Sequence, residues 1–180
     1  MISREVPQVG DGELKVVSSI AAAPADGDQV LTVAVSVEGG LGADGPAFAD
    51  FVVNTLNDPR GWPHEGYAFA SADSASAADV TVVLASPDTS AAMCRPLETF
   101  GKLSCRNGGR VVLTWYRWVG GIEGYGTDLN AYRRYLVNHE IGHVLGKGHV
   151  SCPGAGSVAP VMMQQTLGLD GCLPNSWPHP

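Results

Sequence analysis

The chain has no stretch of 18 or more consecutive apolar residues, which excludes a membrane-spanning helix. Its first ten residues contain charges and Pro7 but no apolar segment, so they do not resemble a signal peptide. Basic residues are few, because 11 Lys and Arg stand against 18 Asp and Glu, a net charge of −7. Without a basic patch to offset this balance, we expect no nucleic-acid partner.

Internal repeats, low-complexity tracts and internal linkers are also absent. A chain of 180 residues is long enough to bury a core without help from other chains. We therefore assign residues 11–180 to a single domain that acts as a monomer. Residues 1–10 are interpreted as a disordered N-terminus or as a segment foreign to the natural chain.

Cysteine is scarce as well, with four residues and no C-x-x-C pair of the kind that binds a metal. Four cysteines allow three pairings. We expect Cys94–Cys105 and Cys152–Cys172, because each bond then closes a local loop on its own side of the motif described next. Each bond would contribute about 3 kcal/mol by restricting the unfolded chain. The disulfides favour a secreted or extracytoplasmic protein whose signal or anchor has been removed, whereas the alternative is four reduced thiols in a cytosolic protein.

The motif H-E-I-G-H-V-L-G-K-G-H, residues 139–149, holds three of the five histidines of the chain. On a helix, His139 and His143 share one face because they are four residues apart, so both imidazoles can reach one ion. Gly146 can adopt a positive φ, which lets the chain leave the helix sharply and bring His149 to the same ion. Three protein ligands leave one coordination position open, as in catalytic zinc sites. We therefore predict one zinc ion per chain.

Glu140 directly follows the first of these histidines. At that position a carboxylate can take a proton from an attacking water molecule without binding the metal itself. The motif thus predicts a zinc site with a general base beside it. The alternative is an ordinary amphipathic helix whose histidines are only packed or exposed.

The motif resembles the extended zinc signature of the metzincin metallopeptidases, whose second hallmark is a downstream turn that contains a methionine, the Met-turn. The resemblance implies that the three histidines bind zinc and that Glu140 is the general base. It also implies that Met162 or Met163 is the Met-turn residue. Met162 is preferred because P-V-M-x-Q-Q-T is similar to a stretch in a family of exported metzincin-like domains from high-GC Gram-positive bacteria. The resemblance extends to Cys-Pro-Gly after the third histidine and to the final Gly-Cys…Pro-Asn-x-Trp-Pro.

Two positions depart from the metzincin pattern. Gln164 or Gln165 stands where some metzincins carry a zinc-associated tyrosine, which leaves the stabiliser of the oxyanion unassigned. Val150 follows the third histidine, where several subfamilies carry a diagnostic Glu, Asp, Pro or Ser, so none of those subfamily labels transfers.

Five segments, most of them rich in valine, predict strands. These segments are Glu13–Ile20, Gln29–Glu38, Tyr67–Ser71, Asp79–Ala85 and Arg110–Val119. A packing helix is predicted over Ala47–Leu56 with Asp44 as its N-cap, and residues 86–108 predict an irregular excursion. The zinc helix is predicted to begin at an N-cap at Thr127 and to end at Gly146. The expected fold class is α+β with an α/β-like N-terminal part: a twisted mixed sheet, the packing and active-site helices, and an irregular C-terminal part.

By resemblance, an edge strand from segment 101–119 lines the cleft and binds a peptide or protein substrate in an extended conformation. We predict a zinc-dependent endopeptidase. Two alternatives stay open: a catalytically weak zinc-containing module that binds peptide or cell wall, and a cell-wall amidase that uses the same zinc chemistry. The intact Glu140 argues against a pure binding module, because binding alone needs no base there.

Overall fold

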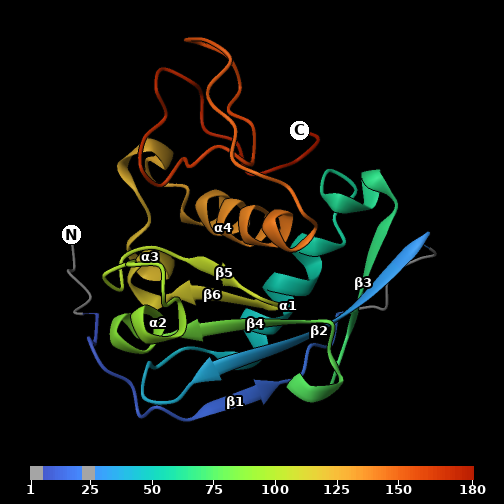
Figure 1. Ribbon diagram of the computed structural model, residues 1–180, viewed down its shortest axis with the longest axis vertical. Coiled ribbons are helices and arrows are strands. Elements are labelled where there is room, and N and C mark those ends of the chain that lie inside the picture. The colour runs from blue at the N-terminus through green and yellow to red at the C-terminus, as the bar shows by residue number, and fades with distance from the viewer. Residues whose placement is uncertain (1–5, 22–26) are drawn as a thin grey trace.

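The computed structural model describes residues 6–21 and 27–180 (Figure 1). The elements are β1 (Leu14–Val17), β2 (Gln29–Glu38), α1 (Gly45–Leu56), β3 (Tyr67–Ser71), β4 (Val80–Ala85), α2 (Pro87–Met93), β5 (Cys105–Asn107), β6 (Arg110–Thr114), α3 (Trp115–Gly120) and α4 (Leu129–Val144). Three short 3-10 helices are η1 (Trp62–Glu65), η2 (Ala75–Ala77) and η3 (Glu123–Tyr125). This is the predicted α+β class. The prediction for residues 1–10 lies partly outside the described residues, which begin at Val6.

The strands form one open mixed sheet in the order β1-β2-β4-β6-β5, with β3 paired to the first half of β2. The central strands β2, β4 and β6 run parallel to one another, whereas β1 and β5 at the two ends are antiparallel to their neighbours. β5 is therefore an edge strand, and it lies within segment 101–119 as predicted. Figure 1 shows α4 alongside this end of the sheet.

Both faces of the central strands are covered. Along β4, alternate side chains point to opposite faces, so Val82 and Leu84 enter the main core while Val83 and Ala85 enter a second cluster. The main core lies between the sheet and the helices α1 and α4, and the second cluster contains the Cys94–Cys105 disulfide. The continuous apolar sequence of β4 follows from this two-sided burial.

The predicted strand Arg110–Val119 is wrong in its second half, because the strand ends at Thr114 and α3 follows. A strand would direct Trp115 and Trp118 to opposite faces, whereas one helical turn brings them to the same side. Trp118 then packs edge-on against two rings of α1, with centroids 4.9 Å from Phe48 and 5.4 Å from Phe51. Aromatic packing across the fold therefore overrides the β propensity of this segment.

Other segments also differ from the predictions. The first predicted strand is confined to Leu14–Val17, and the excursion over 86–108 contains helix α2. The signal for α2 was present in the sequence, since Ser86 is its N-cap and Pro87 is its first residue. The zinc helix starts at Leu129 with Asp128 as its N-cap, in place of the predicted Thr127, because the Asp128 carboxylate reaches the Ala131 N–H at 2.9 Å.

The C-terminal part is irregular, as predicted, and covers the side of α4 that faces away from the sheet (Figure 1). Within the described part of the chain, its β-type backbone pairing is limited to an isolated bridge between Val158 and Leu173. Side chains fasten this part to α4: Asn138 Nδ2 donates to the Ser176 carbonyl at 2.8 Å, and Ser176 Oγ donates to the Ala131 carbonyl at 2.6 Å. Among the described residues, no helix is long and apolar enough to cross a membrane.

Candidate metal centre

After the C-terminal end of α4 the chain turns back toward the helix, as predicted from Gly146. Gly146 has a φ of +83°, and its N–H donates to the His143 carbonyl at 3.2 Å. The next N–H, from Lys147, reaches back to the Gly142 carbonyl at 2.8 Å. These two bonds form a Schellman motif, which ends the helix and redirects the chain. His149 is thereby brought back over the same face of α4.

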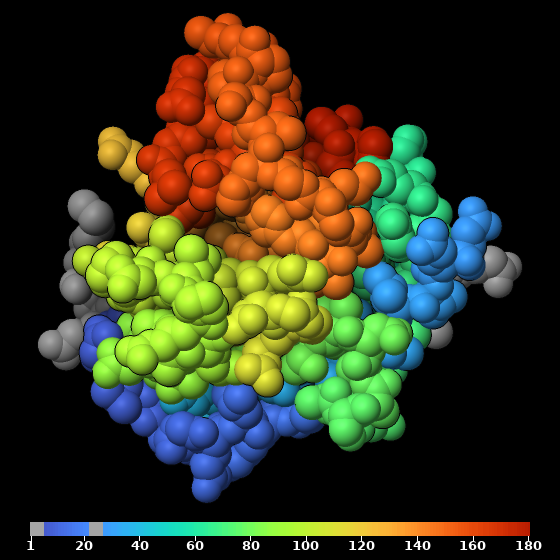
Figure 2. All heavy atoms as spheres, viewed as in Figure 1, coloured from blue at the N-terminus to red at the C-terminus, as the bar shows by residue number. Residues whose placement is uncertain are grey.

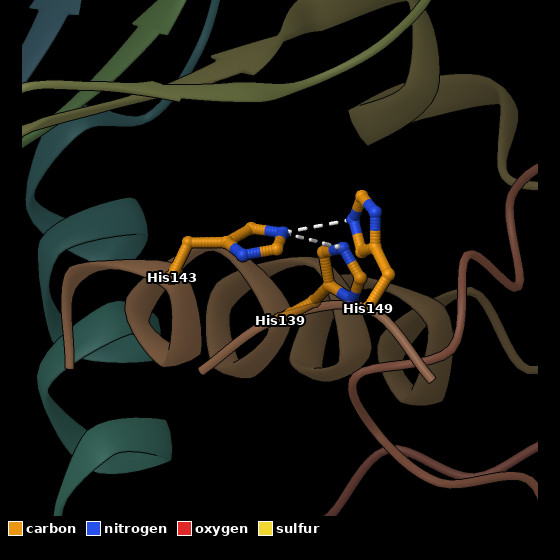
Figure 3. A group of neighbouring side chains, drawn as sticks. All are labelled: His139, His143 and His149. Atoms are coloured by element: carbon orange, nitrogen blue, oxygen red, sulfur yellow. Dashed lines mark hydrogen bonds between the residues drawn. The ribbon is translucent and has the colours of Figure 1, made fainter. Parts of the chain in front are cut away.

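The three histidines of the motif point toward one another (Figure 3). His143 Nε2 lies 3.2 Å from His139 Nε2 and 3.0 Å from His149 Nε2. Two ligands of a tetrahedral zinc ion, each about 2.0–2.1 Å from the metal, are separated by about 3.3 Å. These two separations are therefore close to the spacing that a zinc ion requires, and all three ligand atoms lie within 4.8 Å of one another.

Hydrogen bonds on the other ring nitrogens fix the orientation of two of these histidines. His139 Nδ1 donates to the Val161 carbonyl at 2.8 Å, and His143 Nδ1 donates to the Lys147 carbonyl at 2.9 Å. Because a carbonyl oxygen can only accept, the proton of each ring is on Nδ1 and the lone pair is on Nε2. Nitrogen lone pairs that face one another repel unless a cation lies between them. The donor set thus fits a metal ion.

Desolvation favours the neutral, metal-binding form of two of the three histidines. Burial lowers the pKa of His139 from its ordinary 6.5 to about 4, against the opposing effect of the Val161 hydrogen bond. Burial also lowers the pKa of His149, with a further contribution from the neighbouring His143. Competition between protons and metal for these nitrogens is therefore weak near neutral pH.

Glu140 lines the cleft beside the histidines and is almost fully buried. Its carboxyl makes no hydrogen bond or ion pair within the described chain. Burial without a partner raises the pKa of Glu140 to about 8. A bound divalent cation would lower this pKa again through its charge. A carboxyl in this position can exchange a proton with a molecule in the cleft.

The raised pKa of Glu140 makes the stability of the metal-free protein depend on pH. Between its ordinary value of 4.5 and about 8, the folded state keeps a proton that the unfolded state releases. The free energy of unfolding therefore falls as pH rises through this window. We expect a loss of about 2 kcal/mol from pH 6.5 to 8, measured by denaturant unfolding in the presence of a chelator.

Glu140→Gln is the matched control for this pH dependence, because it keeps the shape of the protonated carboxyl but cannot ionise. His139 and His149 have lowered pKa values, so their effect on stability has the opposite sign and is confined to pH below about 6.5. Both histidines are present in the wild type and in the Gln variant, so their effect is the same in the two pH profiles. Parallel pH profiles for the wild type and the Gln variant between pH 6.5 and 8 would contradict the burial of an ionisable Glu140.

A turn below the histidines contains both candidate methionines. Met162 belongs to the main core and lies against Gly142 of α4, whereas Met163 belongs to a separate cluster with Ala159 and Cys172. Met162 therefore lies under the helix segment that carries the histidines, as preferred from the sequence. Val161, the residue before it, supplies the carbonyl that orients His139.

Gly142 leaves no space for a side chain. A Cβ at this position would overlap the Met162 sulfur and would lie 2.9 Å from Cζ2 of Trp62. We expect Gly142→Ala to lower the free energy of unfolding by about 1–2 kcal/mol, because overpacking outweighs the better helix propensity of Ala. Chemical denaturation measures the change. Gly148→Ala is the control, since a Cβ there meets open space, and an equal loss in both variants would contradict the packing argument.

The cleft above the histidines has a volume of about 550 Å³ and three walls. One wall is α4 with the metal-binding motif. The second comes from residues 97–106 and the third from residues 164–167. Both predicted disulfides are confirmed, and each closes one of these two walls: Cys94–Cys105 the second and Cys152–Cys172 the third. Figure 2 shows the yellow-green segment, which includes the second wall, on one side of the cleft region. The orange and red C-terminal part lies on the other side.

The two glutamines that follow Met163 have different positions. Gln164 is exposed and lines the cleft. Gln165 is fully buried, and its Oε1 accepts hydrogen bonds from the Tyr125 hydroxyl at 2.8 Å and the Asn175 N–H at 3.0 Å. Of the two, only Gln164 could contact a molecule in the cleft.

Tyr135 is a residue of the site that the sequence analysis did not single out. Its ring lies 5.3 Å from that of His139, and its hydroxyl donates to the Met163 carbonyl at 3.0 Å. The same hydroxyl accepts from the Gln165 N–H at 2.9 Å. Tyr135 therefore ties the turn that contains the two methionines to α4. Its position four residues before His139 places it on the ligand face of the helix, a signal present in the sequence.

Comparison with known proteins gives one match. A protein-family model described as "Protein of unknown function (DUF3152)" matches residues 2–180. Neither a search of curated proteins nor a search of solved structures found a match.

Proposed function

We propose that this chain, which belongs to the DUF3152 family of proteins of unknown function, is a zinc-dependent endopeptidase. One observation carries the proposal: three histidine Nε2 atoms converge in a cleft that also contains the carboxyl of Glu140. Structural zinc sites are closed by four side chains, whereas hydrolytic sites keep an open position and a base nearby. The three converging histidines and the neighbouring Glu140 support a site of the second kind, as does the metzincin resemblance of the sequence.

A zinc ion held by His139, His143 and His149 would act as a Lewis acid that polarises the scissile carbonyl. The chain's own chemical step is proton transfer by Glu140. Its carboxylate takes a proton from the attacking water and then donates that proton to the leaving amine nitrogen. Burial raises the pKa of Glu140 in the metal-free protein, whereas the charge of a bound zinc ion would lower it. Hydrogen bonds from Nδ1 hold the first two ligand rings in position throughout.

The edge strand supports an extended peptide as the substrate. β5 pairs with β6 along one side, and its residues Cys105 and Arg106 also line the cleft beside α4. The free backbone groups of an edge strand can pair with a further extended chain. A peptide bound in this way would run past the three histidines and Glu140.

The two disulfides favour an extracytoplasmic location, because such bonds persist in oxidising compartments. We propose that the protein acts outside the cytoplasm.

The test is a digestion of a randomised peptide library and, in parallel, of purified cell-wall fragments by the zinc-loaded protein. Cleavage at internal peptide bonds, mapped by mass spectrometry, is the expected result. Release of products from wall material alone would replace the proposal with a wall amidase. A fully zinc-loaded protein that cleaves neither substrate would replace it with a binding module.

A further inference from the structure

Arg106 is directed into the metal cleft by the register of the edge strand. Arg106 is opposite Val111 in the antiparallel pair of β5 and β6, and directly paired residues share a face of the sheet. Val111 belongs to the core between the sheet and α4. The neighbours of Arg106 point the other way: Cys105 forms the disulfide with Cys94, and Asn107 donates hydrogen bonds to the 93 and 95 carbonyls. The side chain of Arg106 therefore lies on the α4 side, where it lines the cleft.

The positive charge of Arg106 is not compensated within the described chain. The cleft contains two other charged residues, and both are accounted for. Glu140 is buried beside the histidines, and the Lys147 ammonium pairs with the carboxylate of Glu65. Arg106, by contrast, is exposed and makes no hydrogen bond, ion pair or ring contact through its guanidinium among the described residues. The unpaired cation is notable in a protein with a net charge of −7, where carboxylates are plentiful.

We propose that Arg106 determines specificity by binding a carboxylate side chain of the substrate, so that the cleft selects peptides with Asp or Glu near the scissile bond. This inference rests on the proposed endopeptidase function. A guanidinium offers a planar fork of N–H donors that matches a carboxylate in a bidentate manner. A peptide added to β5 would have side chains next to Arg106 on the same face, within the distance of a cross-strand pair.

The experiment compares the zinc-loaded wild type with Arg106→Ala, Arg106→Glu and Arg110→Ala. Arg110 is the matched control, because it is an exposed arginine on the adjacent strand β6 that does not line the cleft. A randomised peptide library first locates the preferred position. Pairs of fluorogenic peptides that differ only by Asp against Asn at that position then give the ratio of their kcat/KM values.

We expect the wild type to cleave the Asp peptide roughly tenfold faster than the Asn peptide, the value for one charge-assisted hydrogen-bond pair. Arg106→Ala should bring the ratio close to one, and Arg106→Glu should favour a Lys peptide. Arg110→Ala should keep the wild-type ratio. Cleavage without an acidic preference, or a preference that survives in Arg106→Ala, would overturn the role of Arg106 and leave the endopeptidase function in place.

If the protein is not an endopeptidase, the experiment gives a result that differs from a failure of the Arg106 proposal alone. If the zinc-loaded wild type cleaves no peptide, the same library is passed over the immobilised wild type and Arg106→Ala proteins. Enrichment of acidic peptides on the wild type alone would support carboxylate binding at Arg106 in a protein that is not a peptidase. Equal recovery on both proteins would overturn it.

Discussion

Replacing Glu140 with Ala is expected to lower peptidase activity at least about 10²-fold while the zinc content stays at one ion per chain. One positioned acid–base group contributes at least about this factor. The substitution removes the proton acceptor in the cleft but none of the three nitrogen ligands. The ligand rings also keep their Nδ1 hydrogen bonds to the Val161 and Lys147 carbonyls. The measurements are kcat/KM on a cleaved library peptide and metal analysis of the same sample.

Glu140→Gln is the isosteric partner of this variant, since it keeps the volume of the side chain but cannot accept and return a proton. Both variants should lose activity to a similar extent. Full activity in either one would show that another group is the base and would leave the metal site itself unaffected. Zinc lost together with activity would mean that the carboxylate contributes to metal binding.

Replacing His143 with Ala is expected to abolish zinc binding and the stability that zinc supplies. Wild type at a free zinc concentration a thousandfold above its dissociation constant gains about 4 kcal/mol relative to the metal-free state. The variant should show no such gain, because its nitrogen is the one that neighbours both other ligands, at 3.2 and 3.0 Å. Thermal or chemical unfolding with and without zinc measures the difference.

The chelated wild type is the reference for the His143 variant. In a chelator the two proteins should differ by no more than about 1 kcal/mol, the contribution of the lost hydrogen bond to the Lys147 carbonyl. A large difference that persists in the chelator would assign His143 a structural role. Stoichiometric zinc in the variant would show that the ion is bound elsewhere.

The cluster of three histidines was predictable because its members are close in the sequence. His139 and His143 are one helical turn apart, and Gly146 allows the sharp exit that returns His149. Local backbone geometry therefore brings the three rings near one another, and the Val161 carbonyl from a later segment fixes the ring of His139. The disulfides were predictable for a related reason, since each joins cysteines within one local loop, 11 and 20 residues apart.

The features that the sequence analysis missed depend on contacts between distant segments. The strand predicted through Val119 ends at Thr114. The reason is that Trp118 packs against the rings of Phe48 and Phe51, about 70 residues away in the chain. The direction of Arg106 depends on its register opposite Val111, which no local pattern specifies. The metzincin activity and the substrate stay predictions, because geometry at the histidines does not identify the bond that is cut.

The hydrogen bond from His139 to the Val161 carbonyl has a consequence for the order of events during biosynthesis. The sheet is complete once Thr114 has been made, so it can form early on the ribosome. The acceptor that orients His139, by contrast, is synthesised after all three histidines, and Ser176, which fastens the tail to α4, comes later still. A nascent chain therefore exposes its histidines before it can hold them in place. We expect capture of the metal to be a late step of maturation, after the segment that contains Val161 and Ser176 has been made and has packed against α4.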